Sequence, residues 1–555
     1  MFRLLILALV IVAGLLWLAD TVLDQPRGLQ DVEVQLDHAR PRPQGGFYRC
    51  AVEKPATLNP FCAIDSVARR FVLAYTHDAL FDLDPTTGEL RPALAIGPYR
   101  ETEEHGAPVF EFTLRPDLVF SDGTPLTMRD VEFTATAARG IAAGEVAEAT
   151  RSITRFEPVD DHTFRLHAES FDGTLGHTIA TQFRVVQRAW FLERIGELAS
   201  AQRVPIPAIG SDEFAELLRQ VHLPGPGTGP YRLHGDQAHW PLRDTLTLTQ
   251  NPHCWRRAEY PMAWNLAGIH LLLDPALNNP LAAMQETVDY VTGSYDFDAL
   301  LEREPRLREN YRLFTYDKLR QQTFVVIWSC RRPPFDSADV RRALTMLFDR
   351  QKLCDRVFNG YARIPQSWFR AGSEFAAPEL RPLPFDPENA RKLLAAAGPE
   401  RPVVEIFAPS GVEMFQQILE LSVDDFRAGG VELRIRTEPW QRLQTRLADG
   451  DFTGGILYLE GHGAVVDPAD KFHSKHSAGY GGYSDPRFDA LLELASAERE
   501  PNLRRERLRD VSRWIHREQP VTLLLYPRAR VLLHKRFESV SVGPLGLYPE
   551  LWWVR

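Results

Sequence analysis

The sequence predicts an α/β protein built from more than one lobe, and three observations lead to this prediction. The chain has 555 residues, and one hydrophobic core rarely serves more than about 250–300 residues, so at least two lobes are expected. The segment 323–328 is almost continuously apolar, which is typical of a strand in a sheet covered on both faces. Strand-like segments at 403–407 and 431–436 flank a helical pattern at 413–428. This β-α-β order predicts parallel strands joined by a crossover helix.

The other elements are predicted from local patterns along the chain. A strand at 47–52 precedes a stretch at 69–81 whose apolar residues have helical spacing. Pro387 suits the first turn of a helix, with Asp386 as its cap. Another helix begins near Val340. Further strands are expected at 108–114, 163–168, 245–248, 269–273 and 521–526.

Composition limits the functional classes. The chain is 44% hydrophobic and 25% charged, which is ordinary for a globular protein. It carries 74 acidic and 64 basic residues, so its formal net charge is −10. This modest acidity argues against a nucleic-acid partner. It says little about a small ligand, because net charge mainly affects solubility.

The five cysteines form no CxxC pair, so a redox motif or a cysteine metal site is not expected. Cys50 and Cys62 are the nearest pair and could close a short loop in an oxidising compartment. The alternative is that all five are free thiols in the protein interior.

The sequence contains no recognisable catalytic pattern. HExxH, GxSxG and P-loop motifs are absent from it. His473 and His476 have a spacing found in metal sites, but Lys471 and Lys475 beside them repel a cation, so solvated loop histidines are expected. We predict no catalytic residue, no metal and no cofactor.

The N-terminal segment predicts a membrane anchor or a signal peptide. Residues 4–19 are continuously apolar and follow Arg3; neighbouring apolar residues extend the run toward the roughly 20 residues that span a bilayer. The cationic start places everything downstream across the membrane. Cleavage at the end of the run would put Trp17 where a small residue is preferred, so an uncleaved anchor is favoured over a removed signal peptide. We assign 1–23 to the anchor or signal, and 24–46, polar and broken by prolines, to a linker.

Residues 120–133, Phe-Ser-Asp-Gly-Thr-Pro-Leu-Thr-Met-Arg-Asp-Val-Glu-Phe, are the most informative segment. Asp122-Gly123 predicts a tight turn, because glycine accepts a positive φ. Thr127 and Asp130 have the spacing of a capping box at the start of a helix. The segment resembles the FxDGTPLTAxDVxFS signature of the extracellular solute-binding proteins of family 5, the oligopeptide/dipeptide type that delivers ligands to ABC transporters.

Four further segments resemble motifs of the same family, in the family's order, although Ser337 stands where the family has an aspartate. These segments are 227–233 with 251–255, 333–350, 385–398 and 482–489.

The resemblance implies a two-lobed periplasmic-binding-protein fold (type II, cluster C) with an extra inserted lobe, here preceded by an N-terminal transmembrane helix. Crossovers between the lobes are implied near 315–319 and 526–528. The implied division is lobe I at 47–84, 226–317 and 527–555, the inserted lobe II at 85–225, and lobe III at 318–526.

The resemblance also implies where a ligand would bind. Glu53, in the loop after the first strand, could lie near the ligand backbone or simply at the surface. Trp440 resembles a cleft tryptophan, with a core position as the alternative. Arg446 resembles a basic position facing a ligand carboxylate, with a solvated helix face as the alternative. Tyr526, at the second crossover, could stack on the ligand.

One segment departs from the family. At 457–468 peptide binders have an aspartate that holds the ligand's ammonium group; here Ala464 occupies that position. Glu460 could supply the carboxylate from a shifted loop, beside Gly461 and His462, or the ammonium site could be absent.

The resemblance implies a substrate-binding component of an ABC transporter that takes an oligopeptide-like solute and is not an enzyme. It would be a monomer on the periplasmic side of the inner membrane and would contact permease subunits. The alternatives are a soluble periplasmic form after signal cleavage, a membrane-anchored sensing receptor, and a non-peptide ligand such as a glycan, a metal chelate or an opine-like acid.

Overall fold

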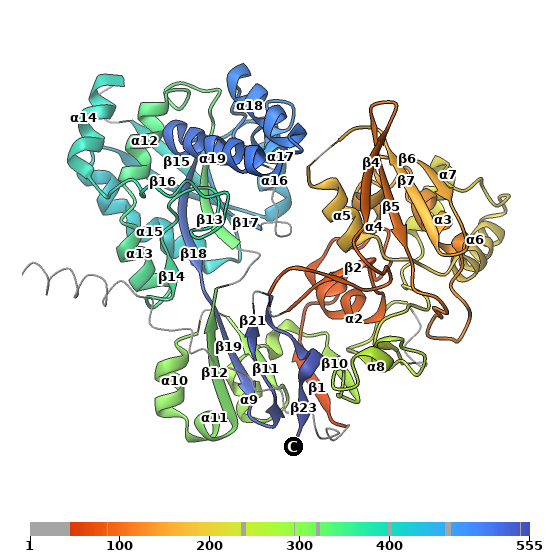
Figure 1. The fold of residues 1–555 in the computed structure, drawn as a ribbon. Helices are drawn as coiled ribbons and strands as arrows, with labels where there is room; N and C mark the ends of the chain where they lie inside the picture. Colours follow the sequence, from red (N-terminus) through yellow and green to blue (C-terminus); the bar gives the residue numbers. More distant parts are fainter. Residues whose placement is uncertain are drawn as a thin grey trace, which may run out of the picture. The chain divides into compact units, whose positions relative to one another are not determined.

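The computed structural model describes residues 45–85, 87–171, 173–234, 240–293, 295–317, 322–397, 402–460, 468–543 and 545–555 (Figure 1). The predicted anchor at 1–23 and most of the predicted linker lie outside these residues. Within the described part of the chain, no helix is both long enough and apolar enough to cross a membrane.

Lobe I, as we use the term below, is the part built on a seven-stranded sheet of order β12-β19-β11-β1-β10-β9-β8. β1 pairs in parallel with both β10 and β11, while β19 runs antiparallel to β11 and β12. Its strands are β1 (Phe47–Ala51), β8 (Tyr231–Leu233), β9 (Thr245–Gln250), β10 (Gly268–Leu272), β11 (Tyr290–Thr292), β12 (Tyr311–Tyr316) and β19 (Ala529–His534). Its helices are η1 (Ala68–Leu73), α2 (Ala74–Thr76), α8 (Arg256–Glu259), η3 (Pro275–Leu277), α9 (Pro280–Met284), α10 (Phe297–Arg303) and α11 (Pro305–Asn310).

The chain ends on the same lobe, where Phe537 and Trp552 pack into the core that contains β1. These C-terminal elements are β20 (Phe537–Glu538), β21 (Val542–Gly543), β22 (Gly546–Leu547), η5 (Pro549–Leu551) and β23 (Trp553–Val554).

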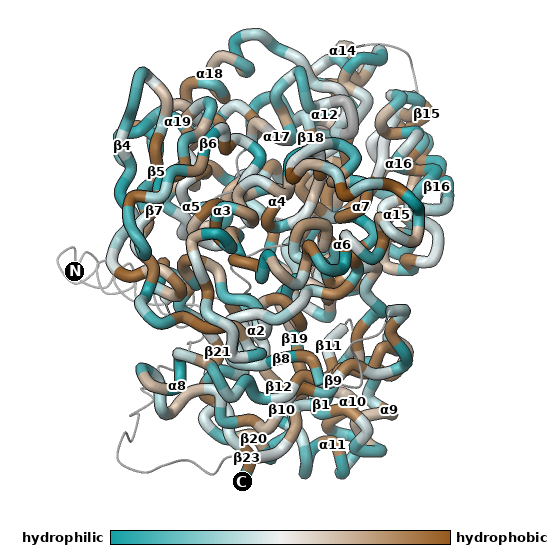
Figure 2. The backbone as a smooth tube through the Cα atoms, turned by 90° about the vertical axis from the view of Figure 1, so that its right-hand side faces the viewer, coloured by the Kyte–Doolittle hydropathy of each residue, from teal (hydrophilic) through white to brown (hydrophobic). Residues whose placement is uncertain are grey.

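Lobe II is the part built on the antiparallel four-stranded sheet β4-β5-β7-β6. Its outer strand β4 is exposed throughout and hydrophilic, whereas the inner strand β5 is largely buried (Figure 2). A small hairpin of β2 (Phe81–Leu83) and β3 (Leu90–Pro92) leads into it and spans the predicted boundary at 84–85. The other elements are β4 (Arg100–Glu104), β5 (Ala107–Thr113), β6 (Ile153–Pro158), β7 (Thr163–Ala168), α3 (Met128–Ala137), α4 (Glu145–Thr150), α5 (Leu175–Gln182), α6 (Arg188–Gln202) and α7 (Asp212–Arg219).

Lobe III is the part built on a six-stranded sheet of order β14-β18-β13-β17-β15-β16. Its strands are β13 (Gln322–Trp328), β14 (Ala362–Arg363), β15 (Val403–Pro409), β16 (Glu432–Glu438), β17 (Gly454–Glu460) and β18 (Val521–Pro527). Its helices are α12 (Ala338–Met346), α13 (Arg350–Val357), α14 (Pro387–Ala397), α15 (Glu413–Ala428), α16 (Trp440–Asp449), α17 (Ala469–Phe472), η4 (Ser477–Tyr480), α18 (Pro486–Ala497) and α19 (Pro501–Glu518).

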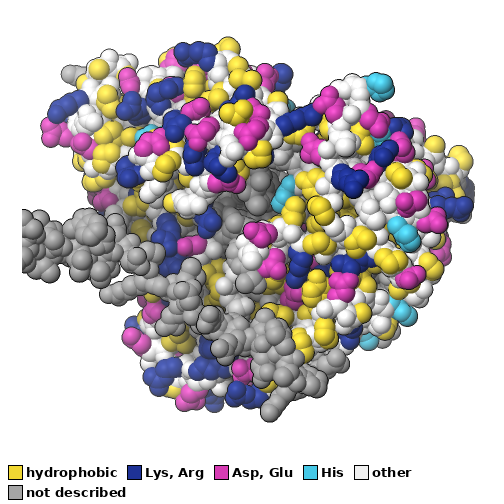
Figure 3. All heavy atoms as spheres, in the orientation of Figure 1, with side chains coloured by type: hydrophobic (Ala, Val, Ile, Leu, Met, Phe, Trp, Pro, Cys, Tyr) yellow, Lys and Arg dark blue, Asp and Glu magenta, His cyan; other side chains and the backbone are white. Residues whose placement is uncertain are grey.

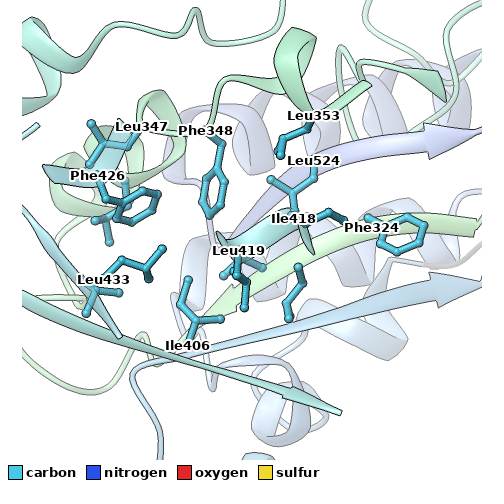
Figure 4. Close-up of a cluster of buried hydrophobic side chains, with 14 of the residues drawn as sticks. Phe324, Leu347, Phe348, Leu353, Ile406, Ile418, Leu419, Phe426, Leu433 and Leu524 are labelled. Atoms are coloured by element: carbon cyan, nitrogen blue, oxygen red, sulfur yellow. The ribbon is translucent and has the colours of Figure 1, made fainter. Parts of the chain in front are cut away.

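The apolar strand predicted at 323–328 is β13, and both of its faces are covered. Phe324, Val326 and Trp328 pack into one hydrophobic cluster, and Val325 and Ile327 pack into another. Figure 4 shows the first cluster, in which side chains from α13, from α15 and from the turn after α12 meet those of the sheet. The predicted β-α-β unit is also confirmed, because β15 and β16 pair in parallel and α15 connects them.

The motif at 120–133 folds as expected. Gly123 has φ +87°, and the Asp122 carboxylate accepts hydrogen bonds from the backbone N–H of Thr124 (3.0 Å) and the side-chain amide of Gln187 (2.9 Å). Asp130 closes the capping box, with one carboxylate oxygen 2.9 Å from the backbone N of Thr127.

The helix expected over 69–81 is shorter than predicted. Helical structure ends at Thr76, and Phe81 already belongs to β2. The backbone N–H of Gly229 donates to the Thr76 carbonyl (2.9 Å), so a non-helical donor takes that acceptor. A Cβ on Gly229 would lie 2.5 Å from the Tyr75 carbonyl oxygen, which explains why residue 229 is a glycine.

All five cysteines are free thiols in the structure. Burial raises the pKa of the Cys50 thiol to about 12, and that of Cys62 to about 11. His473, expected to be solvated, is buried and lies 3.1 Å from a carboxylate oxygen of Glu493, whereas His476 is exposed. Among the residues whose structure is described, no group of side chains has the makings of a metal site.

Candidate ligand-binding cleft

The two large sheets present the carboxyl ends of their strands to the same place, the double crossover between lobes I and III. The chain crosses from β12 to β13 and returns from β18 to β19 (Figure 1). Strand directions then place the carboxyl ends of β1, β10, β11 and β12 at the crossover edge of lobe I. They place the carboxyl ends of β15, β16, β17 and β18 at the crossover edge of lobe III. Ligands of open α/β sheets bind outside the carboxyl ends of the strands, so this junction is the candidate site.

Glu53 lies at this edge of lobe I. It follows the end of β1 by two residues, and its side chain is exposed. Glu53 is therefore exposed beyond the carboxyl end of β1, at the edge of the candidate site.

Trp440 lies at the matching edge of lobe III. It is the first residue of α16, directly after β16, and 47% of its surface is exposed. The core alternative for this tryptophan is therefore wrong. A large aromatic side chain left half-exposed at the end of a strand is available for contact with a ligand.

Tyr458 is a second exposed aromatic at this edge, which sequence reasoning missed. It lies near the carboxyl end of β17, is 48% exposed, and its ring stacks on that of Phe415 at a centroid distance of 6.1 Å. Val412, at the start of the helix that follows β15, is also exposed. In the sequence, the exposure of Tyr458 could have been inferred only from its polar hydroxyl between the apolar residues Leu457 and Leu459.

Arg446 is occupied by its own lobe. Its guanidinium Nη2 donates to Glu438 (2.7 Å) and its Nη1 donates to Asp451 (2.8 Å), and it lies over the Phe407 ring. The hydrogen bond from Arg446 holds the pKa of the Glu438 carboxyl below its usual value. A ligand carboxylate would have to compete with both acidic partners for this guanidinium.

Tyr526 is buried near the end of β18, and its hydroxyl donates to the Ser367 carbonyl (3.2 Å). Burial raises the pKa of this phenol. Glu460 is the last residue of β17, and its backbone pairs with that of Gln322. Gly461 and His462 lie outside the described residues.

Ion pairs connect the lobes at the crossovers, and the sequence did not reveal them. Asp317, just after β12, accepts from Arg363 of lobe III (2.8 Å) and from Arg528 in the return crossover (3.2 Å). Burial opposes ionisation of Asp317, but the hydrogen bonds and charges of the two arginines outweigh it, so its pKa is lowered.

A second set of polar contacts also joins lobes I and III. The Asp298 carboxylate of lobe I accepts from the Tyr361 hydroxyl of lobe III (2.7 Å) and from Arg530 (2.8 Å). The Arg530 guanidinium also lies 3.7 Å from the centre of the Tyr361 ring. These polar contacts lie at the two segments where the chain passes between the lobes, which is where a hinge of a two-lobed protein is expected.

The chain belongs to family 5 of the bacterial extracellular solute-binding proteins. The family model "Bacterial extracellular solute-binding proteins, family 5 Middle" matches residues 89–483, well over half of the chain. The protein is therefore a solute-binding component of an ABC transporter, acts outside the cytoplasm, and is a binding protein rather than an enzyme.

Two relatives and two solved structures illustrate the similarity. Peptide transport periplasmic protein SapA of Salmonella typhimurium is 22% identical over 98% of this chain and 96% of that protein. Probable di/tripeptide-binding protein 5 of Pseudomonas aeruginosa is 27% identical, but the match covers 40% of this chain and 44% of that protein. The oligopeptide-binding protein AppA from Bacillus subtilis, solved with a nonapeptide, has a TM-score of 0.70 and 17% identity, covering 93% of this chain and 100% of that chain. NikA from Brucella suis, solved with Fe(III)-EDTA, has a TM-score of 0.73 and 17% identity, covering 91% of this chain and 100% of that chain. The shared fold is the α/β periplasmic-binding-protein fold.

Proposed function

We propose that the protein binds an oligopeptide-like solute between lobes I and III by hinge closure and passes it to a membrane permease. The observation that carries this proposal is the meeting of two strand carboxyl edges at a double crossover, where Glu53, Trp440 and Tyr458 are exposed. Closure would bury the ligand almost completely, as the enclosed sites of such two-lobed proteins do. The names of two relatives, a peptide transport protein and a probable di/tripeptide-binding protein, favour a peptide.

The proposed ligand contacts are the residues expected from the sequence, and they differ in how accessible each side chain is to a ligand. Glu53 and Trp440 are exposed at the cleft edge and are the first candidates. Arg446 would contribute only if a ligand carboxylate displaced Glu438 or Asp451. Tyr526 is buried, so it would support the floor of the cleft and would not stack directly on the ligand. Glu460, Gly461 and His462 remain proposed contacts of the ligand's amino end.

The finer organisation is also proposed. Residues 1–23 anchor the protein at the periplasmic face of the inner membrane, 24–46 form a tether, and the monomeric body contacts permease subunits. Lobe I comprises 47–84, 226–317 and 527–555, lobe II comprises 85–225, and lobe III comprises 318–526. The three separate main sheets support this division.

Calorimetric titration of the full-length protein tests the ligand class. The probes are a tripeptide, its N-acetylated form, and Fe(III)-EDTA. Binding of the tripeptide, weakened by acetylation, is the expected result, because Glu460 would hold the ammonium group. Binding of Fe(III)-EDTA without any response to peptides would remove the peptide proposal.

The aromatic residue at the cleft edge gives the first mutational test. Trp440→Ala is expected to weaken tripeptide binding at least tenfold, about 1.4 kcal/mol, because half-exposed tryptophans are frequent anchors in binding sites. Leu494→Ala is the matched control, since Leu494 is also exposed but lies on α18, away from the crossover edge. Equal affinities for the two variants would place the ligand elsewhere.

A non-peptide ligand is the second candidate, favoured by Ala464 at the position of the ammonium-binding aspartate. An anchored sensing receptor is a further alternative to delivery. Isolation of the intact protein from membranes separates these roles: permease subunits support transport, and a kinase supports sensing.

A further inference from the structure

Lobes I and II are joined by an apolar interior and buried hydrogen bonds. Phe61, from the loop after β1, packs edge-on against Phe133 and Phe191 of lobe II at centroid distances of 6.1 and 5.4 Å. The buried amide of Asn59 donates to the carbonyls of Leu218 and Val221, each at 2.8 Å. An interface of this kind resists relative motion, so lobes I and II rotate as one body.

Lobe II also contacts lobe III, through residues that are far in the sequence from both crossovers. Nη1 of Arg499 donates to a carboxylate oxygen of Glu103 at 2.7 Å, and the guanidinium lies 4.5 Å from the centre of the Phe171 ring. The backbone N–H of Gly173 donates to the Ser496 carbonyl at 2.9 Å. Figure 1 shows β4 and α5 of lobe II facing α18 of lobe III.

This contact differs in character from the interface between lobes I and II. Arg499 and Glu103 are 44% and 48% exposed. A cavity of about 530 Å³ remains beside them, lined from both lobes by residues that include Glu101, Glu374 and Arg504. The described residues of lobes II and III meet through an exposed ion pair, a backbone hydrogen bond and a cation–π contact. Such contacts can form and break during a functional motion.

We propose that Glu103, Phe171 and Arg499 form a latch that holds lobes II and III together when the cleft between lobes I and III closes. The chain passes between lobes I and III at the two crossovers, with the polar contacts of Asp317 and Asp298 beside them, and lobe II moves with lobe I. Rotation about the crossovers therefore separates Arg499 from Glu103 and Phe171, and closure brings them together. The latch stabilises the closed state from outside the ligand site, so it raises affinity for every ligand by the same factor.

The test uses the full-length protein without ligand, so that it does not depend on the ligand class. Hydrogen exchange of the Gly173 amide reports separation of the lobes, because its acceptor lies on lobe III. Arg499→Glu and Glu103→Arg are each expected to speed this exchange about five- to tenfold, since each loses an ion pair and gains a like-charge contact. The double variant, with the charges exchanged, is expected to return the rate to within about twofold of the original.

The matched control is Arg513→Glu. Arg513 pairs with Glu379 at 2.6 Å, with similar exposure, but both residues lie within lobe III. This variant is expected to leave Gly173 exchange unchanged. The latch would be refuted if the control speeds exchange as much as Arg499→Glu, or if exchanging the charges fails to restore protection.

A second readout connects the latch to the proposed hinge closure, on which it rests. Arg499→Glu should weaken tripeptide binding about fivefold, and Arg513→Glu should not. Unchanged tripeptide affinity in Arg499→Glu would refute the effect of the latch on binding. If no peptide binds the parent protein, the peptide proposal fails while the exchange experiment still decides whether the latch exists.

Discussion

A buried ion pair joins two segments of lobe I that lie far apart in the sequence. Asp78 accepts from Arg256 (Nη2, 2.8 Å) and from the indole N–H of Trp255 (2.8 Å), and both charged partners are almost fully buried. Removing one member of such a pair leaves an uncompensated charge in the interior.

Asp78→Ala is expected to lower the free energy of unfolding by about 3 kcal/mol, because the buried guanidinium of Arg256 keeps only the more exposed carboxylate of Asp82 as an acidic partner. Urea denaturation followed by tryptophan fluorescence measures this loss. The control is Asp339→Ala, which removes an exposed pair with Arg342 and should cost less than about 1 kcal/mol. Similar losses in the two variants would contradict the account of the buried pair.

His77 makes the folded protein sensitive to acid. Its ring is fully buried, with Nε2 3.1 Å from the Pro224 carbonyl and Nδ1 2.9 Å from the Thr76 hydroxyl, so Nε2 carries the proton of the neutral ring. Burial, helped by the charge of Arg184, lowers its pKa to about 3. Below pH about 6.5 this histidine is protonated in the unfolded chain but stays neutral in the folded protein. The free energy of unfolding is therefore not reduced by this residue at neutral pH, and it falls as the pH drops below about 6.5.

His77→Asn tests this linkage. At pH 7 the variant should be less stable than the parent, because hydrogen bonds of the imidazole are lost. The difference should shrink by about 2 kcal/mol between pH 7 and pH 5, since only the parent carries the acid-sensitive group. Unfolding free energies from urea titrations at both pH values measure the change, and a constant difference would contradict the depressed pKa.

At the scale of elements, one carboxylate joins two helices of lobe II. Asp130 closes the capping box of α3, and its second oxygen accepts from the backbone N–H of Arg188 at the start of α6 (2.9 Å). Asp130→Ala is expected to cost about 2–3 kcal/mol, more than the roughly 1 kcal/mol of an ordinary cap, because two helix starts lose an acceptor. Urea denaturation measures this loss.

Thr136→Ala provides the matched control within α3. Its hydroxyl donates to the carbonyls of Glu132 and Phe133, both in the same helix, so the change should cost less than about 1 kcal/mol. A loss in Asp130→Ala no larger than that in the control would show that the link to α6 contributes nothing.

Elements with a clear period were predicted well from the sequence. The bounds of α15 match the predicted helix at 413–428, because its apolar residues repeat with helical spacing and strands flank it. The helix over 69–81 was predicted too long, because a backbone donor from Gly229, far away in the sequence, takes the carbonyl of Thr76. Local patterns do not contain such a competitor.

The site was predicted only in part, for the same reason. The resemblance led us to expect Glu53 and Trp440 near a ligand, and both are exposed beyond strand ends, whereas the partners of Arg446 and the exposure of Tyr458 depend on how α16 and α15 pack. The pair of Glu103 and Arg499 joins residues 396 positions apart, and each alone resembles any charged surface residue. Figure 3 shows how widely such acidic and basic side chains are interspersed on one face of the protein.

At the scale of the whole molecule, we assign a different role to each of the three lobes. In the mechanism that we propose, lobes I and III supply the strand ends that face a ligand, the paired crossovers supply the axis of motion, and lobe II, packed on lobe I, extends the closing contact beyond the cleft. The free energy of ligand binding is then shared between contacts in the cleft and contacts that only closure creates.

Small-angle X-ray scattering of the full-length protein during a tripeptide titration tests this account most directly. We expect the radius of gyration to fall as the peptide saturates the protein, with the peptide recovered chemically unchanged afterwards. A saturating peptide that leaves the radius of gyration unaltered, or that is recovered cleaved, would contradict a protein that works by closing around its solute.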